Sequence, residues 1–429
     1  MKTQGNPLDK FALESGVLMN IISINELMVQ AKEEMQKLGY SPYTIRNECE
    51  IALAPIVRYH EQFGKENFDT DVIDEYVKGV EKNATCGEIG RYRYLLLKRG
   101  VARLTVLHDT GKLEWIRPLR ASKFKLNKYY DEILTEYLSC ETITPGTQKS
   151  AFWVARKYFA WLIQMGNYDF SNVGCNEIQQ FMIYCSNHID EGSLCIVKRH
   201  MKKICRYLAK SGRSANSHAS LLSFPVYVKQ KILPAIPQEE VNDTLDVIDR
   251  SSSKGKRDYA IILLSTVTGL RGIDIRKLKL KDIDWKNGEI RIVQSKTSKS
   301  LALPLTKDVG EAIRDYILNG RPKCDSKTIF LSCYAPYQAL SRSIAGYFYN
   351  TYRKEAGLSH EPFDGKSFHA LRRSVGRNMI TSGIPVTTVA QVLGHGNINS
   401  TKKYISLDSK HLKECALDFT DIELTRREA

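Results

Sequence analysis

The sequence predicts a mainly α-helical protein with one small antiparallel β-sheet in its C-terminal third. Over the first two hundred residues, apolar side chains recur at helical spacing between charged ones. Residues 281–305 instead alternate like strands around an Asn287-Gly288 dipeptide, which is a strong short signal for a hairpin. The length of 429 residues suggests roughly three domains at ~150 residues each.

The composition narrows the class of protein. Hydrophobic residues make up 42% and charged residues 26%, which excludes a disordered or collagen-like chain. No apolar run approaches the ~18 residues that a membrane span needs, and the first residues do not resemble a secretory signal. We therefore expect a cytoplasmic protein without a membrane partner. The net charge of +15 favours a polyanionic partner, but is weak evidence by itself.

The ten cysteines do not form the spacing of a zinc site. Cys175, Cys185, Cys195 and Cys205 recur every ten residues, but the chain contains no C-x-x-C pair. We therefore expect reduced and mostly buried thiols rather than metal ligands or disulfides.

The first 224 residues are typical of one helical module used twice. Helical patterns cover residues 24–38 and 154–165. Three groups of residues recur at offsets of 103, 102 and 101: Ser41-Pro-Tyr-Thr44 with Thr144-Pro-Gly-Thr147, Gly64 and Phe68 with Gly166 and Phe170, and Leu107 and Gly111 with Leu208 and Gly212. The small drift of the offset favours duplication, with chance similarity as the alternative. We predict an N-terminal helical domain over residues 1–118 and a second helical domain over residues 119–224.

Two basic clusters lie in this part of the chain. One follows the first module and holds Arg117, Arg120, Lys123, Lys125 and Lys128; the other lies in a helical pattern and holds Lys198, Arg199, His200, Lys202 and Lys203. Each cluster is either a solvated surface or a contact to a phosphate backbone, where Lys and Arg release counterions. The residues leave both interpretations open.

The remaining chain divides into a linker, a third domain and a tail. Pro225, Pro234 and Pro237 indicate a linker over residues 225–237. Helices are expected from Gln238 and over residues 259–267, and strands over residues 281–285, 289–294 and 301–305. A third domain is predicted over residues 238–406. The apolar spacing of Leu412, Cys415, Ala416 and Phe419 predicts a tail helix within residues 407–429.

Four short segments of the third domain carry side chains suited to phosphate chemistry. They are Thr268-Gly-Leu-Arg271-Gly-Ile-Asp274, Lys296-Thr297, His369-Ala-Leu-Arg372, and Leu393-Gly-His395 followed nine residues later by Tyr404. Each motif is weak alone, but their joint order and spacing are specific.

This ordered set closely resembles the tyrosine recombinase, or phage integrase, family over residues 237–406. Residues 142–212 also resemble the family's helical core-binding (SAM-like) domain. The resemblance implies an integrase or transposase of a mobile element, associated with the nucleoid, whose helical and catalytic domains clamp double-stranded DNA from two faces. It further implies a homo-tetramer on two DNA sites, with an accessory DNA-bending or directionality factor as a further partner.

The residue types support this chemistry. Negative charge grows on the phosphate as a nucleophile approaches, and the fork-shaped guanidiniums of Arg271 and Arg372 suit it best. His395 is expected to donate a further hydrogen bond to the phosphate. Tyr404 is the only tyrosine after His395 and is the expected nucleophile, which the resemblance implies forms a 3′-phosphotyrosyl link. No metal or nucleotide cofactor is expected.

The supporting roles are less sharply defined. Lys296 is the expected general acid, with Lys299 on the same turn as its rival. His369 either accepts the phenolic proton or orients the phosphate. Asp274 is expected to orient Arg271. Arg373 stands where many relatives carry a second histidine, outside the six expected catalytic positions.

One segment of the chain departs from the usual family arrangement, and some roles and functions remain undecided. Residues 1–118 are additional to the usual arrangement, and their role is undetermined between DNA and protein contact. The tail helix packs on its own domain or, as the resemblance favours, docks into a neighbouring protomer. Three alternative functions remain: type IB topoisomerase-like relaxation, a non-catalytic DNA-binding protein, and a metal nuclease that uses His369 and His395.

Overall fold

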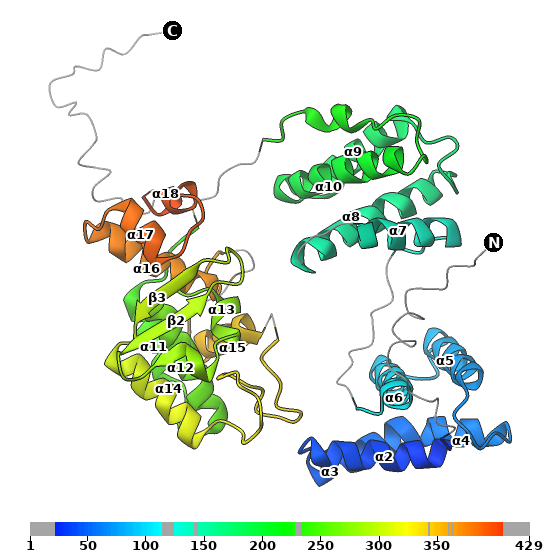
Figure 1. Cartoon of the computed structure of the whole chain (residues 1–429), viewed down its shortest axis with the longest axis horizontal. Coiled ribbons are helices and arrows are strands. Elements are labelled where there is room, and N and C mark those ends of the chain that lie inside the picture. Colours follow the sequence, from blue (N-terminus) through cyan, green and yellow to red (C-terminus); the bar gives the residue numbers. More distant parts are fainter. Residues whose placement is uncertain are drawn as a thin grey trace, which may run out of the picture. The chain divides into compact units, whose positions relative to one another are not determined.

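The computed structural model describes residues 22–113, 124–140, 145–227, 233–341, 344–358, 361 and 364–405 (Figure 1). By compactness the chain divides into two units, one of residues 119–231 and the other of residues 1–118 together with 232–429. The predicted division into five segments stays a prediction. The predicted tail helix within residues 407–429 lies outside the described residues. So do Arg117, Arg120 and Lys123 of the first basic cluster. None of the described helices is both long and apolar enough to cross a membrane.

The N-terminal module is a set of helices around its own apolar core. Its elements are α2 (Ile24–Lys37), α3 (Pro42–Asn47), the π-helix η1 (Glu48–Leu53), α4 (Ala54–Gln62), α5 (Thr70–Thr85) and α6 (Arg91–Thr110). Ser23 and Glu26 form a capping box at the start of α2, which satisfies backbone N–H groups that the helix leaves without partners. Leu27, Ile56 and Leu104 are fully buried in this core.

The second helical module has a similar order of helices, in which α8 takes the place of the continuous segment of α3, η1 and α4, and it ends in an additional short 3₁₀ helix. It contains α7 (Lys128–Cys140), α8 (Pro145–Gln164), α9 (Cys175–His188), α10 (Glu191–Lys210) and the short 3₁₀ helix η2 (Ala219–Ser223) (Figure 1). Aromatic side chains fill its core: the rings of Tyr130 and Phe159 stack with centroids 5.1 Å apart, and Phe170 meets Tyr130 edge-on at 5.2 Å.

The structure explains the first step of the drifting repeat. The helical segment from Pro42 to Gln62 corresponds to α8 but is one residue longer, and the repeat offset falls from 103 to 102 across it. The extra residue coincides with η1, whose wider i→i+5 turns accommodate an insertion without breaking the helix. Gly64 and Gly166, which follow the two helices, both have positive φ, of 65° and 85°. Duplication of one module stays a prediction.

The third domain combines helices with the predicted sheet. Its elements are α11 (Gln238–Asp246), α12 (Ser253–Thr268), α13 (Gly272–Arg276), η3 (Leu280–Asp282), β1 (Ile283–Asp284), β2 (Glu289–Val293), β3 (Ser300–Pro304), α14 (Lys307–Asn319), α15 (Ile344–Glu355), α16 (His369–Thr381), α17 (Val386–Val392) and α18 (Asn399–Ile405). The prediction of a mainly helical fold with one small antiparallel sheet is confirmed.

The three strands pair in sequence order, β1-β2-β3, with antiparallel neighbours. Ile290 pairs with Ile283 on one side and Leu303 on the other, and Ile290 and Ile292 both face the core. The first strand is shorter than predicted, because residues 280–282 form a 3₁₀ turn. The Asp282 carboxylate accepts the Lys279 N–H at 2.9 Å and so closes this turn.

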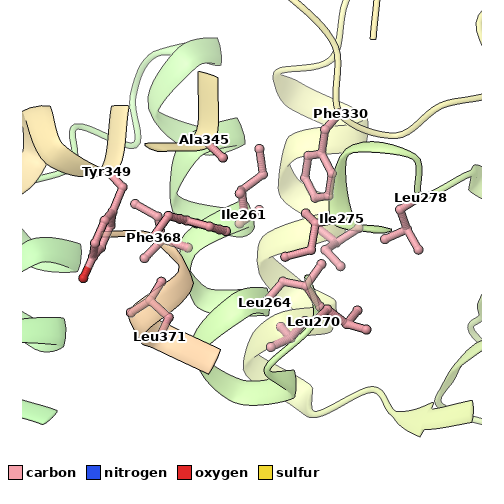
Figure 2. Packing of buried hydrophobic residues seen from close by; sticks show 14 of the residues in the cluster. Ile261, Leu264, Leu270, Ile275, Leu278, Phe330, Ala345, Tyr349, Phe368 and Leu371 are labelled. Carbon is pink, nitrogen blue, oxygen red and sulfur yellow. The ribbon is translucent and has the colours of Figure 1, made fainter. Parts of the chain in front are cut away.

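The core of this domain holds the ends of the helices that carry the predicted site residues. Figure 2 shows Ile261 and Leu264 of α12 among buried side chains that include Leu270, Phe368 and Leu371. Burying a side chain of this size stabilises the fold by about 1.5–3 kcal/mol. The C-terminal end of α12 and the start of α16 are therefore held by the same apolar cluster.

Candidate active site

Arg271 projects from a tight turn at the end of α12. Gly269 ends that helix with φ 63°, and a Cβ at this position would lie 2.9 Å from the side chain of Leu393. The turn places Arg271 at the N-cap of α13, where its side chain is half-buried. The guanidinium donates from Nη1 to Gln294 Oε1 at 2.9 Å and from Nη2 to the Gly394 carbonyl at 3.3 Å.

Arg372 lies one turn into α16 and is only 2% exposed. Its guanidinium donates to the Gly269 carbonyl at 2.7 Å and to the Leu393 carbonyl. Burial, followed by the positive charge of Arg271, lowers the pKa of Arg372 to about 10. The side chain therefore stays charged at neutral pH. The two guanidiniums are held at the consecutive carbonyls of residues 393 and 394, so folding brings them together.

Tyr404 lies on α18 and is 1% exposed. Its ring packs against Gly376 of α16, where a Cβ would come within 2.8 Å of a ring carbon. Burial raises the pKa of the Tyr404 phenol, while the charge and hydrogen bond of Arg372 act in the opposite direction. The expected nucleophile and the buried guanidinium are therefore neighbours within one chain.

His395 follows the turn whose carbonyls accept from both guanidiniums. Its Nδ1 lies 2.6 Å from the hydroxyl of the buried Thr401, a contact that orients the ring. The imidazole stacks with the Tyr404 ring, with 6.0 Å between centroids and 24° between planes. The structure thus groups His395 with Tyr404 and both arginines.

The two candidate general acids lie on the exposed turn between β2 and β3. Gln294 and Lys299 close this turn with a 2.9 Å backbone hydrogen bond, and Ser298 takes a positive φ of 53°. Lys296 and Lys299 are both exposed. A groove of about 360 Å³ runs between the start of β3 and the end of α17, and its lining includes Lys299 and His395 but not Lys296. The choice between the two lysines therefore stays open.

His369 is the first residue of α16 and is exposed to solvent. The helix places it one turn before Arg372, as the i, i+3 spacing predicted. Its roles as proton acceptor and as phosphate ligand both remain predictions.

The carboxylate of Asp274 contacts the turn between β2 and β3. The carboxylate is 4% exposed, and its Oδ1 accepts the N–H of Ser295 at 2.8 Å. The guanidinium of Arg271 instead takes Gln294 and Gly394 as acceptors. Asp274 therefore contacts the turn that carries Lys296, and its expected role in orienting Arg271 stays a prediction.

Gln294 and Gly376 were missed in the sequence, and Gly394 was named only as part of the Leu393-Gly-His395 motif. Gln294 is 1% exposed and accepts from Arg271, while Gly376 and Gly394 leave room for neighbouring side chains. A signal for Gln294 was available, because it follows Ile290 and Ile292 on the buried face of β2, where a polar residue needs a specific partner. No comparable sequence signal marked Gly376.

Arg373 has a different environment from its neighbour Arg372. Its guanidinium donates to the Pro234 carbonyl at 3.1 Å and to the Gly365 carbonyl. It therefore ties the end of the linker to α16.

Among the described residues, no three His, Cys, Asp or Glu side chains cluster closely enough to suit a metal ion.

Known proteins are similar to this chain in sequence and in fold. Residues 234–411 match the phage integrase family. The chain is 30% identical over 230 residues to a predicted integrase/recombinase of Sinorhizobium fredii, y4rF, covering 53% of this chain and 54% of that relative. It therefore spans about half the length of that relative. It is also 31% identical over 222 residues to tyrosine recombinase XerC of Shewanella amazonensis, covering 51% of this chain and 72% of that relative.

A solved structure supports the same assignment at the level of fold. The crystal structure of a lambda integrase tetramer bound to a Holliday junction aligns with a TM-score of 0.52 and 17% identity, covering 79% of this chain and 92% of that chain. Family match, identity and shared fold lead to one conclusion: the chain belongs to the tyrosine recombinase, or phage integrase, family.

Proposed function

We propose that this protein is a site-specific recombinase, the integrase or transposase of a mobile element, which cuts and rejoins double-stranded DNA through Tyr404. One observation carries the proposal: the guanidiniums of Arg271 and Arg372 are held at consecutive carbonyls, and the Tyr404 phenol lies against Arg372 in the same chain.

The arginines would bind the scissile phosphate. Arg372 remains charged at neutral pH although its pKa is lowered to about 10, and the planar guanidinium of an arginine can donate two parallel hydrogen bonds to phosphate oxygens. Because backbone carbonyls already hold them in place, little reorganisation is needed as negative charge grows in the transition state. His395 would donate a further hydrogen bond from a ring that Thr401 orients.

The covalent step is a transesterification. The Tyr404 oxygen forms a bond to phosphorus while the bond from phosphorus to the 5′ oxygen breaks. Lys296, or Lys299 as the alternative, donates a proton to the departing 5′ oxygen. The phenolic proton passes to His369 or to solvent. The products are a 3′-phosphotyrosyl link and a 5′-hydroxyl, and the reverse step rejoins the DNA without a nucleotide.

The burial of Tyr404 places a requirement on DNA binding. A phosphate must reach a phenol that is 1% exposed and packed between α16 and α17 in the apolar cluster with Leu393. We therefore infer that α18 shifts away from α16 when DNA enters the site.

The assembly is proposed from the relatives. The lambda integrase structure is a tetramer on a Holliday junction, and we propose a homo-tetramer on two DNA sites for this chain. Docking of residues 407–429 into a neighbouring protomer, an accessory directionality factor and association with the nucleoid belong to the same proposal.

The DNA contact is assigned to the second helical module rather than the first. Residues 119–231 carry 16 Lys and Arg against 8 Asp and Glu, whereas residues 1–118 carry 16 against 17. At the repeat offset of 101, the basic positions Lys202, Lys203 and Lys210 of α10 are taken by Val101, Ala102 and Asp109 in α6. Binding to phosphates depends on such charge, so the N-terminal domain is not proposed as a DNA contact.

A matched pair of charge reversals tests this assignment. Arg206 and Lys78 are both exposed, on α10 and α5 respectively. Arg206→Glu should weaken DNA binding and reduce the slope of log affinity against log salt by about 1, whereas Lys78→Glu should change neither. Equal effects of the two variants on filter-binding titrations would contradict the assignment.

The recombinase function is tested with a nicked suicide substrate made from the DNA that flanks the protein's own gene. The nick lets the short strand diffuse away, so a covalent protein–DNA adduct accumulates and its junction can be sequenced. Binding without any adduct would favour a non-catalytic DNA-binding protein. Relaxation of a single supercoiled plasmid without exchange between paired sites would favour the topoisomerase alternative, and loss of cleavage with a chelator would favour a metal nuclease.

A further inference from the structure

The side chain of Gln294 connects three segments of the candidate site. It follows β2 on the buried face of the sheet and is 1% exposed. Its own backbone closes the turn that carries both lysines, because its N–H donates to the Lys299 carbonyl and its carbonyl accepts from the Ser298 N–H, both at 2.9 Å. Any movement of this residue therefore moves the turn.

The carboxamide joins the arginines to that turn. Its Oε1 accepts from Arg271 Nη1 at 2.9 Å and from the Thr297 hydroxyl at 2.7 Å. Its Nε2 donates to the Leu393 carbonyl at 3.3 Å, which also accepts from Arg372. One amide thus contacts the start of α13, the turn between β2 and β3, and the segment that leads into His395.

The backbone at Gly394 lies directly against the side-chain amide of Gln294. Gly394 has φ 61°, and a Cβ there would lie 2.3 Å from both the oxygen and the nitrogen of the Gln294 side chain. The glycine is therefore required both by its backbone conformation and by the close approach of the amide.

The chemistry of the position favours glutamine over other residues. A neutral amide accepts from Arg271 without neutralising the positive charge that the phosphate needs. A carboxylate there would pair with the guanidinium and could not donate to the Leu393 carbonyl. A methionine of similar length would supply none of the three hydrogen bonds.

We propose that Gln294 is a positioning residue for strand cleavage, which aims Arg271 at the scissile phosphate and sets the Lys296 turn relative to His395. This role rests on the proposed recombinase function. It goes beyond the six expected catalytic positions, because Gln294 acts through Arg271 and the turn rather than on the DNA.

The first measurement compares two glutamine substitutions in the full-length protein. Gln294→Met removes the amide but keeps the length of the side chain. Gln238→Met is the matched control, because Gln238 lies in the same domain, is exposed and bonds only Asn242 on its own helix at 3.0 Å. At saturating DNA, Gln294→Met should slow adduct formation on the nicked substrate by about 100-fold, the scale of losing an aligned donor. DNA affinity and the rate of Gln238→Met should stay within about threefold of wild type.

The second measurement separates positioning from general loosening. We use nicked DNA whose scissile phosphate carries a methyl group in place of one charged oxygen. The need for an aligned guanidinium falls on this uncharged substrate, so the penalty of Gln294→Met relative to wild type should shrink to about tenfold or less. A merely structural defect would slow cleavage of both substrates by the same factor.

The outcomes are distinguishable. Equal penalties on the two substrates, or a Gln294→Met rate within about threefold of wild type, would overturn the positioning role while the recombinase function stands. A wild-type protein that binds its site but forms no adduct would instead overturn the proposed function, and with it this role.

Discussion

The buried and exposed halves of the candidate site differ in what holds their side chains. Arg372 and Tyr404 are 2% and 1% exposed, packed among α16, α17 and α18. Lys296 and Lys299 lie on a solvent-exposed turn. The half that must bind charge in one geometry is enclosed, whereas the half that must supply a proton is open to water.

This difference has an energetic origin. A buried guanidinium loses hydration, which is why the pKa of Arg372 falls to about 10. The Gly269 and Leu393 carbonyls replace some of the lost water contacts and fix the fork in place. An exposed lysine needs no such support, so the turn can be short and polar. The comparison predicts larger losses from changes in the enclosed half.

The largest effect is expected from removing the phenolic oxygen. Tyr404→Phe should form no covalent adduct above background, because only the nucleophilic atom is lost. DNA binding should be unchanged, since the ring still fills the space beside Gly376. Gel analysis of the nicked substrate provides the measurement, with the buried Tyr349→Phe of the same domain as the control. A residual adduct on another tyrosine would remove Tyr404 from its role.

The second effect concerns the shape of a charged group. Arg271→Lys keeps the charge but loses the two-pronged contact to Gln294 and Gly394. We expect cleavage at saturating DNA to slow by about 100- to 1,000-fold. Arg291→Lys is the control, because Arg291 is exposed on β2. Activity of Arg271→Lys within fivefold of wild type would show that point charge alone suffices.

The third effect distinguishes between Lys296 and Lys299, the two lysines of the exposed half. Lys296→Ala should slow cleavage by about 100-fold through loss of the general acid, while Lys299→Ala should cost only severalfold. A substrate with sulfur at the 5′ bridging position has a leaving group that needs no protonation, so it should restore Lys296→Ala but not Arg271→Lys. The reverse pattern between the two lysines would assign the acid to Lys299, which lines the groove with His395.

The smallest effect is on stability at high pH. Burial raises the pKa of Tyr404 above its ordinary value of 10, so the folded state favours the neutral phenol. That stability is fully present below pH 10 and is lost as pH rises through the folded pKa. Tyr404→Phe should therefore lose less thermal stability than wild type above pH 10, as measured by Tm across pH 8–11. Parallel Tm curves would show that the phenol does not titrate differently on folding.

Much of the fold and of the site could be predicted from local patterns. The helix over residues 24–38, the turn at Asn287-Gly288 and the following strands depend on spacing and turn chemistry that neighbouring residues supply. The set Arg271, Arg372, His395 and Tyr404 could be anticipated because the motifs occur in a specific order, and the structure groups these four residues. The partner of Asp274 could not be predicted, since it depends on which loop α13 faces.

The residue order along the chain was thus enough to establish the helical class, the single small sheet, the family and the identities of the expected site residues. Only long-range packing could reveal that Tyr404 is enclosed, that Gly376 and Gly394 make room for it and for an amide, and that Gln294 links three segments. The physical reason is separation along the chain: Gln294 and Leu393 are 99 residues apart. Such contacts leave no local periodicity, and they form only when the apolar core brings distant helices to one place.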